Sequence, residues 1–458
     1  MNRVRTAAAA LAAAGIVTAA AACSSAAKTP TTTATTATTV AALPATPPGV
    51  QARWLLGTLA HLPVPAAAIT AHFDQVFRAK VSAAQLNAIL GQFTNMRLDA
   101  VALSTSEFVI LNVTDNGHPQ TVTLSVDAHG QIDGLRLAAA PTQAAPPVPA
   151  TWAAVDKQVE QAAPRTRLLV ASVSGGDCRP IQAIGATTPA PLGSAFKLYV
   201  LDALARAIAA GTVSWDQRLT LTSQLKSLPS GELSTEPAGT QLTVLQAAED
   251  MISSSDNTAA DLLINLVGRT AVEAAAAASG MADPALDTPF LTTRELFVLK
   301  LDDWPALADR YLALDAAGRL AMLTGTVDRA SLPTVAAATA WTTPRDIGSI
   351  EWFASPADIC KVYASLAALA REPGLAPVAS VLQINDGGLG LDPRQWQQVW
   401  FKGGSEPGVV TLNYLATTRG GRSYLVSVMA ANPAAPISAA ATAPLLDAIK
   451  GAFALAVK

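Results

Sequence analysis

The sequence predicts an α+β protein with two folded domains, the second much larger than the first. The chain has 458 residues, more than one compact domain usually holds. Two low-complexity stretches, residues 23–48 and 141–151, separate residues 49–140 from residues 152–458. Strand and helix patterns occur in both parts, and the larger part has strands near both of its ends.

Composition excludes two broad classes of protein. Hydrophobic residues make up 50% of the chain, but many are alanine, and no stretch after residue 25 approaches the roughly 18 apolar residues of a spanning helix. The net charge is −3, with no basic block and no stripe of aromatic and basic residues. We therefore expect neither a membrane-embedded domain nor a nucleic-acid partner.

The first 22 residues have the parts of an export signal. Arg3 and Arg5 precede an uncharged run that ends in small residues at Ala22. Cys23 follows directly, which resembles the bacterial lipoprotein signal, although Ala20 stands where that family prefers leucine. The resemblance implies export, lipidation of Cys23 and anchoring to the outer face of the cell membrane. Plain secretion with an incidental Cys23 is the alternative. A permanent anchor helix is the less favoured interpretation of the uncharged run.

Residues 23–48 are expected to be a disordered tether. Eight of the eleven residues from Thr29 to Thr39 are threonine, and Lys28 is the only charged residue of the stretch. Such a segment cannot bury a core. Its composition also permits O-glycosylation.

Residues 49–140 predict a small α+β domain in which helices precede an antiparallel sheet. This arrangement resembles the cystatin-like and NTF2-like domains found ahead of some exported hydrolases. No catalytic motif lies in it. The expected helices are Val50–Leu59, Ala66–Phe77 and one capped by Ser82; the expected strands are Phe108–Val113, Thr121–Asp127 and Ile132–Leu137, with a turn at His129-Gly130.

Histidine and cysteine placement limits metal and redox chemistry. The four histidines, His61, His72, His118 and His129, have no metal-ligand spacing and are expected to be surface or hydrogen-bonded residues. No metal or other cofactor is expected. Cys178 and Cys360 form an even pair in an oxidising compartment, so either one disulfide or two buried thiols is consistent with the sequence.

Residues 152–458 predict one antiparallel sheet, built from the two ends of the domain and flanked by helices. A last helix is expected to open at Pro444 and to run to Val457. The other expected elements are an opening hairpin (Leu168–Val173 and Ile181–Ala186), helices Tyr199–Ala210, Val244–Ile252 and Thr258–Val267, and a closing hairpin (Val409–Ala416 and Tyr424–Ala430).

This larger part contains no histidine, so a Ser-His-Asp triad is impossible there, and a nucleophile would need a lysine or carboxylate base. Ser-x-x-Lys occurs three times in the chain, at Ser25–Lys28, Ser194–Lys197 and Ser223–Lys226. The first lies in the tether, and the third leads into Pro229 and Gly231, which do not continue a helix.

Ser194 and Lys197 sit one turn apart at the start of an apolar helical run. A lysine buried there loses its proton more readily and can act as base toward the hydroxyl. The alternative is a capping Ser194 with a Lys197 whose ammonium reaches solvent.

Two further motifs follow in the sequence. Ser255-Asp256-Asn257 lies between two expected helices, where each of these residue types also favours a helix cap. Lys402-Gly403-Gly404-Ser405 leads into the strand at Val409, and alone it would be an ordinary turn.

In this order the three motifs resemble those of class A β-lactamases and penicillin-binding proteins. The resemblance covers residues 152–458 and implies a β-lactamase-like fold. It also implies an acylated Ser194 with Lys197 as its general base, and a Ser255 that relays a proton to the leaving nitrogen. By the same resemblance Asn257 binds the substrate amide, Lys402 binds the substrate carboxylate, and the backbone N–H groups of Ser194 and Ser405 form the oxyanion hole.

The sequence departs from that family at two points. Gly403 stands where a threonine or serine hydroxyl is usual, and Ser405 is a partial replacement. No Glu-x-x-Leu-Asn follows the second motif, so the carboxylate that positions the deacylating water has no clear match. Glu295, Asp346 and Glu351 are the acids that we consider for this role. A capping box with Thr292 explains Glu295 more simply. We therefore expect slow deacylation.

Three functions are consistent with these motifs. The first is a monomeric serine hydrolase that forms an acyl-enzyme with β-lactams or related amides and esters. The second is a peptidoglycan peptidase. The third is a catalytically poor envelope protein that uses the cleft and the small N-terminal domain for binding, although such a protein need not keep Ser194, Lys197, Ser255 and Asn257 together.

Overall fold

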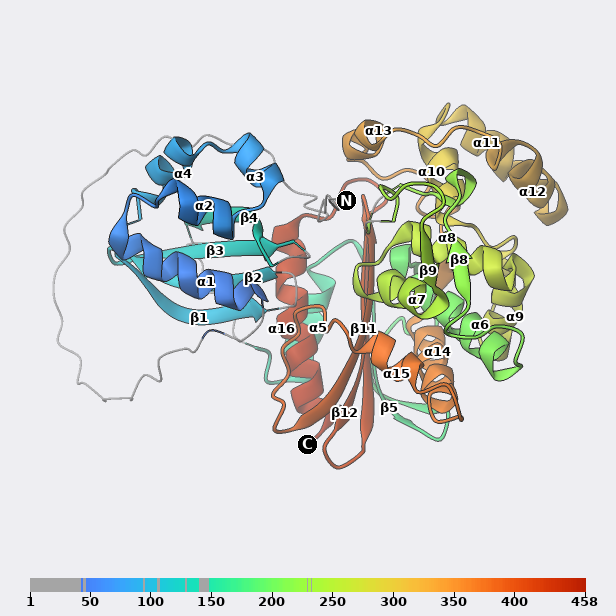
Figure 1. The fold of residues 1–458 in the computed structure, drawn as a ribbon. Helices are drawn as coiled ribbons and strands as arrows, with labels where there is room; N and C mark the ends of the chain where they lie inside the picture. Colours follow the sequence, from blue (N-terminus) through green and yellow to red (C-terminus); the bar gives the residue numbers. More distant parts are fainter. Residues whose placement is uncertain are drawn as a thin grey trace. The chain divides into compact units, whose positions relative to one another are not determined.

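The computed structural model describes Leu43 and residues 47–458, apart from residues 94, 105–107, 128–129, 140–147, 229 and 232. The chain forms two compact units that divide between residues 142 and 143 (Figure 1). The predicted signal peptide, Cys23, most of the tether and His129 lie outside the described residues. Within the described part, no helix is both long enough and apolar enough to cross a membrane.

The smaller unit packs short helices against a four-stranded antiparallel sheet with strand order β1-β2-β3-β4 (Figure 1). This confirms the predicted order of helices followed by strands, although β1 was not predicted. The helices are α1 (Pro47–Thr58), η1 (Leu59–His61), α2 (Ala66–His72), α3 (Gln75–Lys80) and α4 (Ala83–Leu90), and the strands are β1 (Met96–Ser104), β2 (Phe108–Asp115), β3 (His118–Val126) and β4 (Ile132–Ala139).

The predicted helix over Ala66–Phe77 is wrong, because the chain breaks there into α2 and α3. Phe73 leaves the helix to form a β-bridge with Ile132. The Asp74 side chain then accepts a hydrogen bond from Phe77 N at 2.6 Å and caps α3. The cap offers the backbone donors of α3 a local partner, which the apolar spacing alone did not reveal.

The larger unit is built on a five-stranded antiparallel sheet with strand order β11-β12-β13-β5-β6. The closing hairpin pairs with the opening one through β13 and β5, so the predicted sheet from both ends of the domain is confirmed. The strands of this unit are β5 (Arg165–Ser174), β6 (Asp177–Ile184), β7 (Ala190–Pro191), β8 (Arg218–Thr220), β9 (Gln241–Thr243), β10 (Phe353–Ala354), β11 (Trp396–Glu406), β12 (Val409–Thr418) and β13 (Ser423–Ala431).

Helices cover both faces of this sheet (Figure 1). Helices α5 (Trp152–Glu160) and α16 (Ala439–Ala456) pack on one face. The larger apolar core lies on the other face and includes α6 (Lys197–Ala209) and α14 (Pro356–Leu369). The remaining helices are η2 (Gly193–Phe196), η3 (Ser223–Leu225), α7 (Val244–Ser253), α8 (Asn257–Val267), α9 (Arg269–Ala278), η4 (Pro284–Asp287), α10 (Thr293–Leu301), α11 (Ala306–Leu312), α12 (Ala316–Met322), η5 (Leu323–Val327), α13 (Val335–Ala340) and α15 (Pro377–Leu382).

Cys178 on β6 and Cys360 on α14 form a disulfide. Of the two arrangements that the sequence permitted, the structure has the bonded one. The bond joins an edge strand of the sheet to a helix of the larger core.

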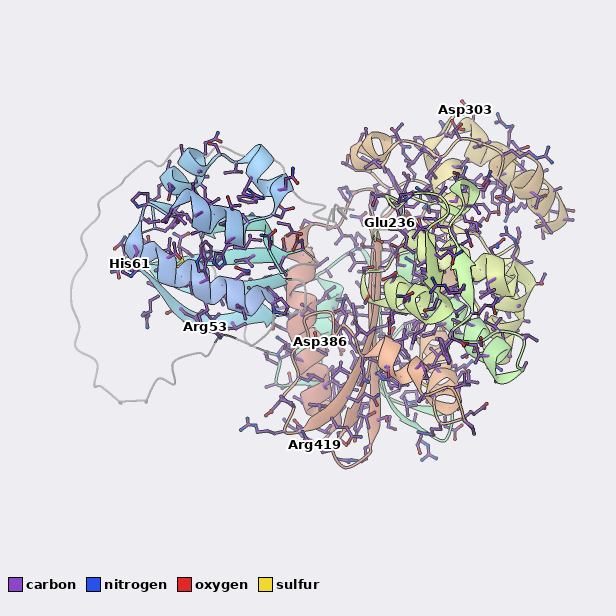
Figure 2. The ribbon with its side chains drawn as sticks, viewed as in Figure 1. Arg53, His61, Glu236, Asp303, Asp386 and Arg419 are labelled. Carbon is purple, nitrogen blue, oxygen red and sulfur yellow. A yellow bond between two sulfur atoms is a disulfide. The ribbon has the colours of Figure 1, made fainter. Side chains whose placement is uncertain are left out.

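One prediction and one alternative interpretation for the C-terminal region need correction. Pro444 does not open the last helix, because α16 begins at Ala439, where the Ser438 side chain caps it by accepting from Ala441 N at 3.2 Å. Lys402-Gly403-Gly404-Ser405 does not form a turn. It lies within β11, and each of its four residues pairs with a residue of β12. The turn that joins β12 to β13 is further along and carries Arg419, which is labelled in Figure 2 and donates to Pro393 O at 2.8 Å.

Candidate active site

Ser194 lies in the 3-10 turn η2, and Lys197 is the first residue of α6. The apolar residues that follow Lys197 are buried, so the first turns of α6 lie within the core. Both side chains therefore stand at the N-terminal end of a core helix. Lys197 is fully buried (0% exposed), so its ammonium does not reach solvent as the alternative interpretation required.

Three side chains from two stretches of the chain meet the Lys197 ammonium, and together with Lys197 we call them the Lys197 cluster: Ser194, Lys197, Ser255 and Asn257. Lys197 Nζ lies 3.2 Å from Ser194 Oγ and 3.2 Å from Ser255 Oγ. It also donates to Asn257 Oδ1 at 2.7 Å and to the Ser255 carbonyl oxygen. All the partners that bind the ammonium here are neutral oxygens.

The turn between α7 and α8 holds Ser255 and Asn257 in place. Ser255 has a φ of 58°, a left-handed backbone that is uncommon for a residue other than glycine. Asp256 caps α8 by accepting from Ala259 N at 2.8 Å, and its other oxygen accepts from Leu233 N at 2.9 Å. Ser230 Oγ donates to the Ser255 carbonyl oxygen at 2.6 Å, so the preceding loop supports the same turn.

Strand β11 brings the third motif to the cluster from the sheet. Lys402, which is 3% exposed, donates to Ser255 Oγ at 2.8 Å and to Gly403 O at 2.9 Å. The Ser255 hydroxyl therefore lies between two lysine ammonium groups. The predicted residues Ser194, Lys197, Ser255, Asn257 and Lys402 are all brought together in this way.

Backbone-to-backbone contact between β11 and η2 explains two glycines. A Cβ on Gly404 would lie 2.1 Å from Leu192 O and 2.6 Å from Ser194 N. Gly193 has a φ of +50°, and a Cβ there would lie 2.7 Å from Ser405 N. No other residue type fits these positions without moving the backbone. The contact places the backbone nitrogens of Ser194 and Ser405 on neighbouring segments, while the Ser405 side chain is exposed.

Burial changes the acidity of both lysines. Desolvation lowers the pKa of Lys197 to about 7, although the charges of Asp256 and Asp261 act in the opposite direction. Desolvation, followed by the nearby charge of Lys197, holds the pKa of Lys402 well below its usual value. An amine with a pKa near 7 is an effective general base at neutral pH.

The three acids considered as deacylation bases bind partners outside the Lys197 cluster. Glu295 is fully buried, pairs with Arg269 at 2.6 Å, and closes the capping box of α10 with Thr292. Asp346 accepts from Trp304 Nε1 at 2.7 Å. Glu351 accepts from the backbone of Gly193 at 3.1 Å and of Trp352 at 2.9 Å.

The competing Ser223–Lys226 motif is directed elsewhere, because Lys226 Nζ donates to the carbonyl oxygen of Glu236, a residue labelled in Figure 2. Sequence reasoning missed Ser230, because its turn was considered only as a break in that motif. It also missed Lys300 and Glu406, two buried side chains that are bonded to each other at 2.6 Å. The signal for Lys300 was a single charge within the apolar run Leu296–Leu301.

Among the residues that the structure describes, no three His, Cys, Asp or Glu side chains are grouped as metal ligands would be. His72 instead stacks on Trp54 with ring centroids 3.8 Å apart and bonds Gln51 at 2.8 Å.

Residues 152–350 match the model of the family described as "Beta-lactamase enzyme family". That part of the chain is similar to the β-lactamase enzyme family. Residues 43–132, in the smaller unit, match the model described as "ORF 12 gene product N-terminal". A search of curated proteins found no match.

Solved structures similar to this chain include a β-lactamase from Sphaerobacter thermophilus, at 21% identity and a TM-score of 0.46, covering 67% of this chain and 97% of that one. A β-lactamase from Chitinophaga pinensis has 16% identity and a TM-score of 0.45, covering 66% and 98%. PBP-A, solved as an acyl-enzyme complex with penicillin G, has 14% identity and a TM-score of 0.44, covering 68% and 99%.

Proposed function

We propose that the β-lactamase-like domain is a serine hydrolase that forms an acyl-enzyme on Ser194 with β-lactams or related amides and esters. The observation that carries this proposal is the contact of one buried, low-pKa ammonium group with Ser194 Oγ, Ser255 Oγ and Asn257 Oδ1. Neutral Lys197 takes the hydroxyl proton as Ser194 Oγ bonds to the substrate carbonyl carbon. The carbonyl oxygen becomes an oxyanion and accepts from the backbone N–H groups of Ser194 and Ser405.

Collapse of this tetrahedral intermediate breaks the carbon–nitrogen or carbon–oxygen bond of the substrate. The proton held by Lys197 passes through Ser255 Oγ to the leaving atom, because that hydroxyl is within 3.2 Å of Lys197 Nζ. Lys402 binds the substrate carboxylate, and the added negative charge favours its protonated form. Water then hydrolyses the ester on Ser194 slowly, since the acids at positions 295, 346 and 351 bind other partners.

The cellular setting is part of the proposal. The basic start, the uncharged run and Cys23 support export and lipid anchoring at the outer face of the membrane. The Cys178–Cys360 disulfide is consistent with an oxidising compartment.

Intact-mass spectrometry with a fluorescent penicillin tests the acyl-enzyme. The wild-type protein should gain the mass of one penicillin, and Ser194→Ala should gain none. Ser223→Ala is the matched control, because Ser223 stands in the same Ser-x-x-Lys pattern outside the cluster, and it should be labelled like the wild type. Labelling that persists in Ser194→Ala would reject the proposal.

A further inference from the structure

A second buried cluster of charges lies behind the segment that carries Ser194. Its members are Lys300 on α10, Glu351 in the loop before β10, and Glu406 at the end of β11, and we call them the Glu351 cluster. Lys300 Nζ donates to the two carboxyl oxygens of Glu406 at 2.6 and 2.8 Å. The Lys300 and Glu406 side chains are 0% and 7% exposed, so this is not a surface ion pair.

Glu351 connects this cluster to the residues just before Ser194. Its Oε2 atom accepts from Gly193 N at 3.1 Å and from Trp352 N at 2.9 Å. Leu192 is held on both sides, because its nitrogen donates to Trp352 O and its oxygen accepts from Thr411 Oγ1, both at 2.9 Å. The backbone that leads into Ser194 is therefore held by buried hydrogen bonds, and the Gly193 N–H is bound by a carboxyl group.

Glu406 connects the same cluster to the strand that supplies the second N–H group. It lies two residues after Gly404 and four after Lys402 in β11, so the three share one face of the strand. Gly404 packs on the backbone of Ser194, and Ser405 lies between Gly404 and Glu406. The cluster thus links both segments whose N–H groups would meet the oxyanion.

The charge of this cluster depends on pH. The charged groups that face Glu406 are Lys300 and Glu351; Lys402, on the same strand face, bonds Ser255 instead. Burial raises the pKa of Glu406 to about 8, against the opposing charge of Lys300. Burial also raises the pKa of Glu351, but its two backbone N–H donors favour its ionised form. Glu406 is therefore the carboxyl that keeps a proton below about pH 8.

We propose that Glu351 and Glu406, whose carboxyl groups are hydrogen-bonded to each other beside Lys300, are positioning residues for the oxyanion hole: they hold Gly193 and β11 so that the N–H groups of Ser194 and Ser405 converge on one substrate oxygen. This inference rests on the proposed acylation of Ser194. None of the three side chains touches the reacting atoms. With Glu406 protonated the cluster has no net charge; its ionisation at higher pH adds a negative charge next to the site of the oxyanion, which opposes acylation.

The first test removes the acceptor of the Gly193 N–H. Glu351→Leu should lower the maximal acylation rate by about tenfold or more, less than the roughly 10²–10³-fold loss that follows removal of an oxyanion donor itself. The penicillin concentration for half-maximal rate should change little, because the oxyanion forms only in the transition state. Glu351→Gln keeps an oxygen for both N–H groups and should recover most of the rate.

The matched control is Asp202→Asn. Asp202, like Glu351, is a buried carboxyl with a cation nearby, since Arg206 Nε lies 2.7 Å from it. It lies further along α6, however, where it bonds Ser365. Its acylation rate should equal that of the wild type. Equal rates for Glu351→Leu and the wild type would overturn the inference while leaving acylation of Ser194 intact.

The second test is the pH profile of Glu406→Gln, and it also decides the case if Glu351→Leu fails to fold. The wild-type acylation rate should fall as pH rises through about 8, where Glu406 loses its proton. Glu406→Gln cannot ionise and should lose this falling limb, an effect that a merely structural role would not produce. The same falling limb in Glu406→Gln and the wild type would overturn the inference. A wild-type protein that no penicillin labels would overturn the proposed function and this inference with it.

Discussion

Two lysines of the larger unit are both fully buried, yet their partners differ in kind. Lys197 meets neutral oxygens of Ser194, Ser255 and Asn257, whereas Lys300 meets the carboxyl group of Glu406. An uncompensated buried ammonium gives up its proton easily, while a carboxyl partner stabilises the charged form. The chemistry of a buried lysine therefore depends on its neighbours rather than on burial alone.

The largest expected effect is the loss of the Lys197 amine. Lys197→Ala should slow acylation by on the order of 10²–10⁴-fold, the usual cost of removing a general base. Stopped-flow measurement with a chromogenic cephalosporin would give the rate. Unchanged acylation at neutral pH would mean that another group takes the Ser194 proton, and the contrast between the two lysines would lose its functional meaning.

The same contrast predicts how turnover ends. The described acids considered as deacylation bases bind Arg269, Trp304 or the backbone before Ser194, so acylation should outrun deacylation. With a β-lactam we expect a burst of roughly one product per enzyme, followed by slow turnover. Glu295→Gln and Asp346→Asn should leave the slow phase unchanged. Fast linear turnover without a burst would contradict this, and its disappearance in one of these variants would identify the base.

Stability should respond in the opposite way to the two lysines. At neutral pH, Lys300→Met leaves the ionised Glu351 carboxylate buried without its cation, and it should lower the free energy of unfolding by about 3 kcal/mol, as removing one partner of a buried ion pair does. Lys197→Met removes a buried amine that has no carboxyl partner, so it should leave the free energy of unfolding unchanged or raise it. Urea unfolding of both variants at neutral pH measures the difference. Equal losses in the two variants would erase the distinction.

The smallest expected effect is on the pH dependence of acylation. Lys197 acts as a base only when unprotonated, and its pKa is about 7, so the acylation rate should rise with pH up to that value. Below it the rate should change by about tenfold for each pH unit. Labelling rates between pH 5 and pH 7 measure this limb. A flat profile would indicate that the Lys197 side chain is already an unprotonated amine at acidic pH.

Elements with a local signal could be predicted from the sequence. The two hairpins of the larger sheet, the Ser82 cap and the turn at residues 255–257 each follow from neighbouring residues, and the structure has them. Strand β11 was missed because its two central glycines read as a turn. Gly404 is required by contact with η2, some 200 residues earlier in the chain, and no local pattern shows such a contact.

The candidate site divides in the same way. Three motifs recognisable within a few residues each led to Ser194, Lys197, Ser255, Asn257 and Lys402, which the fold brings together. Glu351 was considered for a different role, and Lys300 and Glu406 were not considered at all. Their relation is a tertiary contact among three segments with no shared motif, so no local pattern in the sequence indicates it.

The Cys178–Cys360 bond turns the chain between these residues, a separation of 182, into a covalent ring. Ser194, Lys197, Ser255 and Asn257 lie inside this ring, while Lys402 and Ser405 lie outside it. Closing so large a loop removes about 5 kcal/mol of conformational freedom from the unfolded chain, but only within the ring. The strands β11 and β12 gain nothing from it directly and are held through their pairing with β13. Oxidation therefore secures one part of the site covalently and leaves the strand that completes it to hydrogen bonds and packing.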